Sequence, residues 1–149
     1  MTSKRDVKHK VYVDLTGGYV TFDSDPRMSE FHKWMMFTCS KILEKSKTFR
    51  RLNGHVEIVA VKDFNYDNRL PDIYTPFFDI ECETGLKYHY DDLKARILST
   101  HKTVIVVVPN EKTKVRYVRN VSVRKEHLKI CTLGEFQRVV SIILQNVKV

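Results

Sequence analysis

The residues best suited to chemistry are acidic and lie in the middle of the chain. Asp79, Glu81 and Glu83 occupy alternate positions of a predicted strand at 77–83, so their side chains share one face of it. Neighbouring like charges destabilise a sheet, and a bound divalent cation turns that repulsion into attraction. Carboxylate oxygens are ligands that suit Mg²⁺ or Mn²⁺. The spacing therefore predicts a metal site on this face.

Asp72 adds a carboxylate on the preceding strand end. A short reversal at 75–76 is expected to bring this strand end back against the strand at 77–83. If the reversal pairs the two strands symmetrically, Asp72 lies opposite Glu81, with roughly 4.5–5.5 Å between their Cβ atoms. The other face of the second strand is apolar and is expected to pack the core through Phe78, Ile80 and Cys82.

The acidic residues fit a known motif. Pro71-Asp72, eight further residues and then Glu81-Cys82-Glu83 resemble the motif of the PD-(D/E)XK nuclease superfamily. The resemblance covers the middle half of the chain, from the helix predicted before His55 to the strand ending at Val108. It implies a restriction-endonuclease-like core, which is an α/β fold with a central mixed β-sheet flanked by helices.

The resemblance also implies an activity, that of a Mg²⁺- or Mn²⁺-dependent endo- or exodeoxyribonuclease. Asp72 and Glu81 would then bind the metal that activates the attacking water. Glu83 stands where the family usually has Lys. It can bind metal or orient water, but it cannot supply a positive charge. Lys87 and Lys94 are the candidates for a Lys that has migrated.

Other acidic residues are alternative metal ligands. Asp79 would join the metal if the register were shifted by two, because Asp79-Ile80-Glu81 also fits the family pattern. In some relatives a Glu from the leading helix joins the metal, which makes Glu30 a candidate. The alternative is a Glu that the helix dipole favours at this position. Glu57 and Asp63 are further candidates, with exposure to water as the alternative.

The charge of the chain favours a polyanionic partner. The sequence has 26 Lys and Arg against 18 Asp and Glu, a net charge of +8 and a pI near 9.4. The expected partner is DNA, with RNA as the alternative. The residues expected to contact it mix cations with aromatic rings, which suits phosphate contact and base stacking: Arg69, Lys87, Tyr88 and His89. His89 could also shuttle protons, and an ordinary surface loop is the alternative.

A single nuclease-like domain is expected for 149 residues. Residues 1–23 predict an N-terminal β-hairpin extension that reverses at Gly17-Gly18. Residues 24–109 are expected to form the core that carries the motif, and residues 110–149 to add basic strands and a closing helix.

Within the core, alternation and apolar runs predict the remaining elements. A helix should start at Asp25-Pro26 and run to about residue 47. The segment 55–62 is apolar enough for a strand in the centre of a sheet, and the segment 103–108 for a strand buried on both faces. Asp91 is expected to cap a helix between the motif and the last strand, with a packing face of Leu93, Ile97 and Leu98.

The C-terminal part is expected to contain edge strands and one helix. The segments 114–119 and 121–125 alternate basic and apolar residues, as edge strands do. Thr132 and Glu135 have the spacing of a capping box, and the apolar positions of an amphipathic helix follow them.

The three cysteines are far apart in the sequence and lack the spacing of a zinc site: Cys39, Cys82 and Cys131. We interpret them as buried thiols in a reducing compartment. No apolar run approaches the length of a membrane span, and the first residues do not read as a signal peptide. A soluble, cytoplasmic protein without membrane contact is expected. A homodimer is an alternative to a monomer, because nucleases of the resembled superfamily often act as dimers.

Two other functions stay open at this point. A non-catalytic nucleic-acid-binding module that keeps the nuclease-like fold is favoured by the missing Lys. An interaction or regulatory protein with an incidental acidic patch is favoured only if the chain binds neither metal nor nucleic acid.

Overall fold

The computed structural model describes residues 9–24, 30–58, 71–85, 90–121, 123 and 126–147. The elements in chain order are β1 (His9–Leu15), β2 (Gly18–Ser24), α1 (Glu30–Lys45), α2 (Lys47–Arg51), β3 (Glu57–Ile58), β4 (Ile73–Tyr74), β5 (Phe78–Cys82), α3 (Tyr90–Ser99), β6 (Thr103–Val108), α4 (Glu111–Asn120), β7 (Leu128–Thr132) and α5 (Leu133–Gln145).

The described strands form a separate hairpin and one mixed sheet. The five-stranded sheet has the order β3-β4-β5-β6-β7. β4 pairs antiparallel with both β3 and β5, whereas β6 pairs parallel with both β5 and β7. The prediction of an α/β fold with a central mixed sheet is therefore confirmed.

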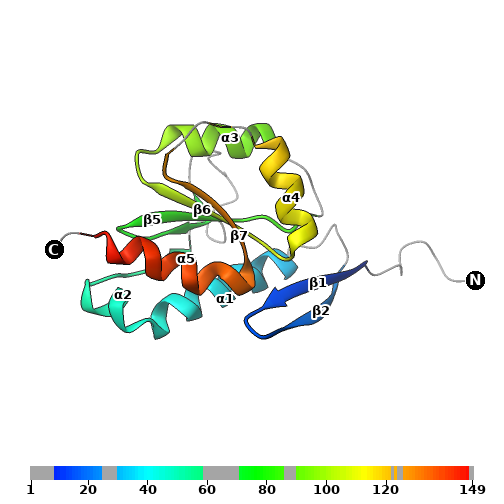
Figure 1. Cartoon of the computed structure of the whole chain (residues 1–149), viewed down its shortest axis with the longest axis horizontal. Coiled ribbons are helices and arrows are strands. Elements are labelled where there is room, and N and C mark those ends of the chain that lie inside the picture. Colours follow the sequence, from blue (N-terminus) through cyan, green and yellow to red (C-terminus); the bar gives the residue numbers. More distant parts are fainter. Residues whose placement is uncertain are drawn as a thin grey trace, which may run out of the picture.

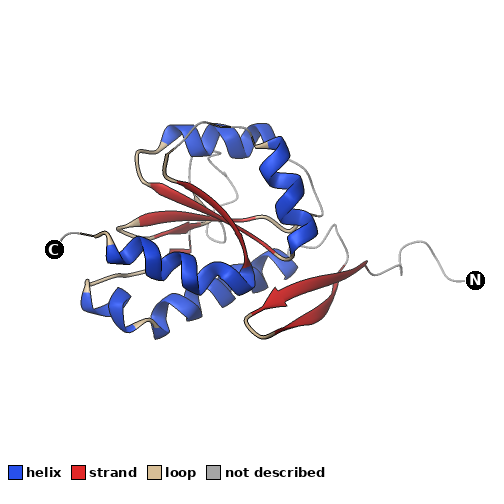
Figure 2. Ribbon diagram, viewed as in Figure 1, coloured by secondary structure: helices blue, strands red, loops and turns tan. Residues whose placement is uncertain are grey.

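Helices cover both faces of this sheet (Figures 1 and 2). The larger apolar core lies between one face, the hairpin and three helices, α1, α2 and α5, and includes Val13, Phe31, Phe49, Ile80 and Phe136. The smaller core lies between the other face and α3 and α4, and consists of Leu93, Ile97, Val104, Val106, Val108, Tyr117 and Val121. The acidic face of β5 belongs to the side of this smaller core.

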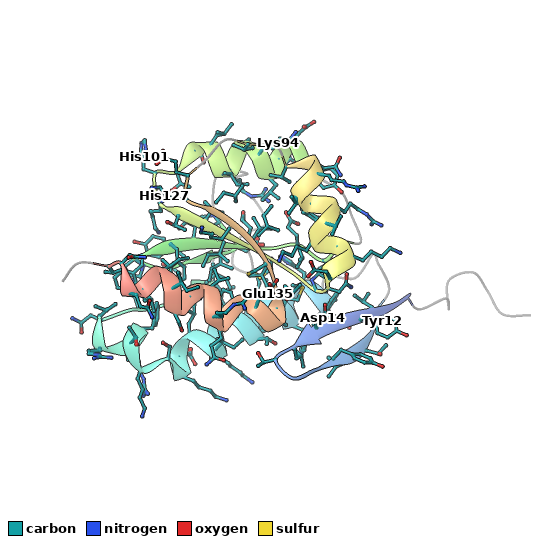
Figure 3. All side chains as sticks on the ribbon, viewed as in Figure 1. Tyr12, Asp14, Lys94, His101, His127 and Glu135 are labelled. Carbon is teal, nitrogen blue, oxygen red and sulfur yellow. The ribbon has the colours of Figure 1, made fainter. Side chains whose placement is uncertain are left out.

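The N-terminal hairpin is packed against the body of the protein. β1 and β2 pair antiparallel, as predicted, and Gly17 in the turn has a φ of 82°, which favours glycine. Val13 is fully buried in the larger core. The backbone N of Asp14 donates to the carbonyl oxygen of Pro109 at 2.7 Å, and the Thr16 hydroxyl donates to that of Gly134 at 2.9 Å. Figure 3 labels Asp14 on β1 and Glu135 on α5, the two elements that meet at this junction.

The prediction of a basic edge strand at 114–119 is wrong, because residues 111–120 form helix α4, while most of the strand predicted at 121–125 lies outside the described residues. The Asn110 side chain caps this helix by accepting from the backbone N of Thr113 at 2.9 Å. Thr113 and Tyr117 are buried four residues apart, which is helical spacing, while Val115 and Val118 are exposed. Alternation over only six residues fits the period of a strand and that of a helix. The helix cap at Asn110 favours the helix.

Four further differences from the predictions concern the sheet and the helices. β3 is described only at 57–58 and lies at the edge of the described sheet, not at its centre. β7, which the sequence did not predict, forms the other edge. Leu98 is exposed and does not pack with Leu93 and Ile97. α3 begins at Tyr90, so Asp91 lies in its first turn and is not its cap.

The helix ends agree in part with prediction. The capping box of Thr132 and Glu135 at the start of α5 is confirmed. α1 ends at Lys45, and Ser46 caps the short helix α2, whereas one helix to about residue 47 was expected. The predicted start at Asp25-Pro26 lies outside the described residues. Among the described helices, none has the length and apolar character needed to cross a membrane.

All three cysteines are free and buried, as predicted. The sulfur atoms of Cys39 and Cys82 lie 4.0 Å apart. The hydrogen bond between them and burial raise the pKa of the Cys82 thiol, and burial raises that of Cys131 to about 12. Protonated thiols of this kind are poor nucleophiles, so these side chains belong to the core.

Gly134 tests the docking of the hairpin. A Cβ atom at this position would lie 2.9 Å from the carbonyl carbon of Leu15. We expect the clash in Gly134→Ala to lower the free energy of unfolding by about 1–3 kcal/mol. The higher helix propensity of alanine offsets up to about 1 kcal/mol of this loss. Urea denaturation would measure it. Gly18→Ala is the control, because a Cβ at Gly18 meets no atom within 4 Å. Equal stability of both variants would contradict the docking.

Candidate metal and acid–base site

Thr75 fixes the reversal between β4 and β5. Its hydroxyl donates to the carbonyl oxygen of Phe78 at 2.6 Å and accepts from the backbone N of the same residue at 3.0 Å. The resulting register pairs Ile73 with Ile80. Continuing that register by one residue places Asp72 opposite Glu81, so the register predicted from a symmetric reversal is confirmed.

Asp72, Glu81 and Glu83 form what we call the carboxylate cluster. Asp72 is 5% exposed and Glu81 is 1% exposed, while the Glu83 side chain is 18% exposed. The backbone N of Asp72 donates to Glu81 Oε1 at 3.1 Å, and the backbone N of Cys82 donates to Asp72 Oδ2 at 2.9 Å. Each of the two opposed carboxylates is thus anchored to the backbone of the other strand.

Arg96 on α3 is the described cation in contact with two members of the cluster. Its Nε donates to Glu81 Oε2 at 2.6 Å, and its Nη2 lies 3.7 Å from Glu83 Oε1. The Arg96 side chain is only 11% exposed. The acidic face of β5 is therefore not an open surface, because α3 covers it and supplies a guanidinium.

His32 on α1 reaches the cluster from another helix. Its Nε2 lies 3.0 Å from Asp72 Oδ2. Burial lowers the pKa of His32, but the hydrogen bond with Asp72 and the charges of Asp72 and Glu83 outweigh it, so that the pKa is raised. His32 is therefore poised to carry a positive charge beside Asp72.

The cluster holds more negative charge than the described residues around it neutralise. Burial, and then the charge of Asp72, raise the pKa of Glu81 well above its ordinary value, although Arg96 lowers it. The same two causes raise the pKa of Glu83 to about 7. Among the described residues, the three carboxylates face one permanent cation, Arg96, and one histidine, His32. A buried excess of this kind favours either protonation or a bound cation.

The carboxylates could serve a hard divalent cation as at most two ligands. Among the described residues, no group of three or more His, Cys, Asp or Glu side chains is arranged to hold a metal ion. Mg²⁺, however, commonly takes one or two carboxylates and completes its shell with water and phosphate oxygens. Asp72 and Glu81 supply two carboxylates on neighbouring strands, but both oxygens of Glu81 already accept hydrogen bonds, from the backbone N of Asp72 and from Arg96 Nε.

Asp79 has a separate partner. Lys102 Nζ lies 2.6 Å from Asp79 Oδ1, donates also to the carbonyl oxygen of Thr75, and sits 3.9 Å from the centre of the Tyr74 ring. A small hollow between this ion pair and α3 is lined by Pro71, Asp79, Glu81, Arg96, Ile97, Thr100 and Val104. Asp79 therefore shares a space with Glu81, but its charge is already balanced.

The other predicted site residues lie apart from the cluster or outside the described residues. Lys94 is half-buried on α3 (Figure 3). The residue of α3 that contacts Glu81 and Glu83 is instead Arg96, two positions further along the chain. Glu30 and Glu57 are exposed. Five positions lie outside the described residues: Asp63, Arg69, Lys87, Tyr88 and His89.

Sequence reasoning missed His32, Arg96 and Lys102. For Arg96 a signal existed, because it borders the apolar face of Leu93 and Ile97 on a helix that had to pack over an acidic strand face. His32 is 40 positions from Asp72, and nothing in its local sequence marks that pairing.

Comparison with models of protein families, with curated proteins and with solved structures found no match to this chain. The likeness to the PD-(D/E)XK superfamily therefore rests on the motif and the order of the elements. It stays a prediction.

Removing Arg96 should strongly destabilise the metal-free protein. Arg96→Gln leaves buried carboxylates without their cation, and we expect the free energy of unfolding to fall by about 3–5 kcal/mol. Arg138→Gln is the matched control, because Arg138 also contacts a glutamate, Glu135, but its side chain is 71% exposed. That change should cost less than about 0.5 kcal/mol. Similar losses in urea denaturation would contradict a buried role for Arg96.

Glu83 should make the metal-free protein less stable as the pH rises. A carboxyl group whose pKa is higher in the folded state binds its proton more tightly there. Its contribution to the free energy of unfolding therefore falls as the pH rises from the ordinary pKa of 4.5 through the folded-state pKa of about 7. Relative to Glu83→Gln, the wild type should lose about 1–3 kcal/mol of unfolding free energy between pH 4 and pH 8. Urea denaturation across this range tests it, and a constant difference would refute the shift.

Proposed function

We propose that this chain is a metal-dependent nuclease that hydrolyses phosphodiester bonds in DNA. The observation that carries the proposal is the opposed pair of Asp72 and Glu81, buried beside Glu83 with one permanent cation. Such a pair is costly without a bound cation and gains stability with one. It also lies at the motif positions where the resembled superfamily binds its metal.

The order of elements supports the finer fold assignment. β3, β4 and β5 are antiparallel, and α3 leads to β6, which is parallel to β5. The restriction-endonuclease-like core has this order of three strands, a helix and a returning strand. We therefore propose that fold for residues 24–109, with α4, β7 and α5 as additions at one edge.

Each residue of the site has a chemical role in this proposal. Asp72 and Glu81 would hold Mg²⁺ or Mn²⁺, which when bound stabilises charge on the phosphate and lowers the pKa of the attacking water. Glu83, with a pKa of about 7, can take a proton from that water near neutral pH. Arg96 would supply the positive charge that the motif Lys supplies in the family.

The partner proposed is DNA, with RNA as the alternative. The net charge of +8 favours a polyanion. Part of that charge lies on α4, where Lys112 and Arg119 are exposed to solvent. Cations on an exposed helix face can contact phosphates without reading sequence, so they favour general affinity for nucleic acid.

The second candidate function is a nucleic-acid-binding module without catalysis. Two observations favour it: Glu83 stands in place of Lys, and Arg96 and His32 already contact the carboxylates that would bind metal. In that case the cluster would be an internal ion network, and DNA would bind elsewhere on the basic surface.

The decisive experiment is cleavage of supercoiled, linear and single-stranded DNA with Mg²⁺ or Mn²⁺. We expect Asp72→Asn and Glu81→Gln to lower the rate roughly 100-fold or more, because a metal ligand contributes several kcal/mol to the transition state. Asp79→Asn is the matched control, since Asp79 is engaged by Lys102. It should keep the wild-type rate within a few-fold.

The outcomes separate the candidates once thermal unfolding has shown that all variants are folded. Loss of activity in Asp79→Asn but not in Asp72→Asn would move the metal to the shifted ligand set. Intact DNA with the wild-type protein on every substrate, together with salt-sensitive binding, would favour the non-catalytic module.

A further inference from the structure

Two large aromatic side chains are exposed on one face of the N-terminal hairpin. Tyr12 of β1 is 58% exposed, and Tyr19 of β2 is 64% exposed. The register pairs Tyr12 with Thr21 and Tyr19 with Asp14, and directly opposed residues of an antiparallel pair share a face. The two tyrosines are therefore diagonal neighbours, and their ring centroids lie 5.4 Å apart. We call this exposed aromatic surface the tyrosine pair.

The strand that carries Tyr12 is fixed from its other face. Val11 and Val13 flank Tyr12 along β1 and are buried in the larger apolar core. The carbonyl oxygen of Tyr12 accepts from Asn110 Nδ2 at 2.7 Å. The ring is thus presented to solvent from a backbone that packing and a hydrogen bond already hold, which lowers the entropy lost when a ligand binds.

Helix α4 begins beside the tyrosine pair. Asn110, which holds the carbonyl oxygen of Tyr12, is also the N-cap of α4. Asp14, the cross-strand partner of Tyr19, accepts through Oδ2 from the backbone N of Glu111 at 3.1 Å. The start of the helix therefore engages the negative charge of Asp14 on this face of the hairpin. Figure 3 labels Tyr12 and Asp14 on β1.

One side of α4 is basic. Lys112, Arg116 and Arg119 follow one another at spacings of four and three residues, so they form a single stripe along the helix, which we call the cationic stripe. Lys112 and Arg119 are exposed, and Arg116 is half-buried. Glu111 is also exposed, but it stands at the first position of α4, where the helix dipole favours an acidic residue. The stripe begins at the next residue, within one turn of the contacts with the hairpin.

Aromatic rings beside cations suit a single nucleic-acid strand. Its unpaired bases can stack on tyrosine rings, while Lys and Arg contact the phosphates between them. A duplex keeps its bases inside the stack, so it would use the cationic stripe and leave the rings unused. A second copy of the chain would bring the same net charge of +8, which opposes association. The combination of rings and charge favours the single strand.

We propose that the tyrosine pair and the cationic stripe bind single-stranded DNA, with bases stacked on the two rings and phosphates at Lys112 and Arg119. None of these residues belongs to the carboxylate cluster. The inference deepens the proposed function, on which its role rests, because it names a single strand or a single-stranded end as the form of the substrate. Binding itself needs neither metal nor cleavage.

Binding of a labelled oligothymidylate of about 20 nucleotides, followed by fluorescence anisotropy without divalent metal, tests the site. Tyr12→Thr and Tyr19→Thr remove a ring and keep a residue that suits a strand. We expect each to raise Kd about 5–100-fold, because stacking on an aromatic ring contributes this much per base. Tyr12→Phe and Tyr19→Phe keep the ring and should stay within about 3-fold of the wild type. Phe37→Ala is the matched control, since it removes a ring that is 49% exposed on α1, and it should leave Kd unchanged.

The salt dependence tests the phosphate contacts. Lys112→Gln should reduce the slope of log Kd against log salt concentration by about 0.7 for the contact that it removes. Lys41→Gln, which removes an exposed lysine from α1, should leave the slope unchanged. An oligouridylate of equal length decides between DNA and RNA as the bound strand, because both present bases and phosphates.

Photo-crosslinking tests the same contact in the wild type, without any variant. Mass spectrometry should locate the bound oligothymidylate on β1 or β2, and crosslinks confined to other elements would overturn the proposal. Threonine variants that are folded by thermal unfolding and bind with wild-type affinity would overturn it too. So would self-association of the wild type, measured by sedimentation, that Tyr12→Thr abolishes, because the tyrosine pair would then be an interface between copies.

These results are separable from those of the cleavage experiment. A wild type that cuts no DNA but binds oligothymidylate through the tyrosine pair would refute the proposed function and support this site. A wild type that cuts duplex DNA but binds no single strand would refute this site and leave the proposed function in place.

Discussion

The rest of the structure depends on the repulsion between buried carboxylates at the β4–β5 pair. Asp72 and Glu81 face each other across the two strands, and Glu83 follows on the same face. Burial and mutual charge raise the pKa values of both glutamates, so the folded chain holds its anionic form at a cost. Backbone N–H groups of the opposite strands lower this cost for Asp72 and Glu81. Arg96 lowers it further, and the sheet must therefore be covered by α3 for the cluster to persist.

Both helical layers take part in this arrangement. Arg96 comes from α3 and His32 from α1, and these helices pack into different apolar cores. The hairpin adds a more distant constraint, because Asp14 Oδ2 accepts from the backbone N of Glu111 at the start of α4. The hairpin is thus tied to the start of α4 and, through the Thr16 hydroxyl, to α5.

The sequence predicts the parts of the site that local periodicity controls. A period of two separates the acidic and apolar faces of β5, and a short reversal sets the register that brings Asp72 opposite Glu81. The same reasoning failed at 114–119, where six alternating residues fit a strand and a helix equally well. The partners of the carboxylates were also missed. His32 and Arg96 meet the cluster through tertiary packing, and no spacing within their own segments specifies it.

The charge balance of the cluster bears on the choice between an enzyme and a binding module. A module that only binds nucleic acid through basic surface residues gains nothing from Glu83, whose pKa of about 7 reflects an unfavourable buried charge. Glutamine at that position would keep the size of the side chain and remove the repulsion with Asp72. We therefore favour the proposed enzyme over the binding module, because the buried repulsion between Glu83 and Asp72 is more readily explained by chemistry than by stability.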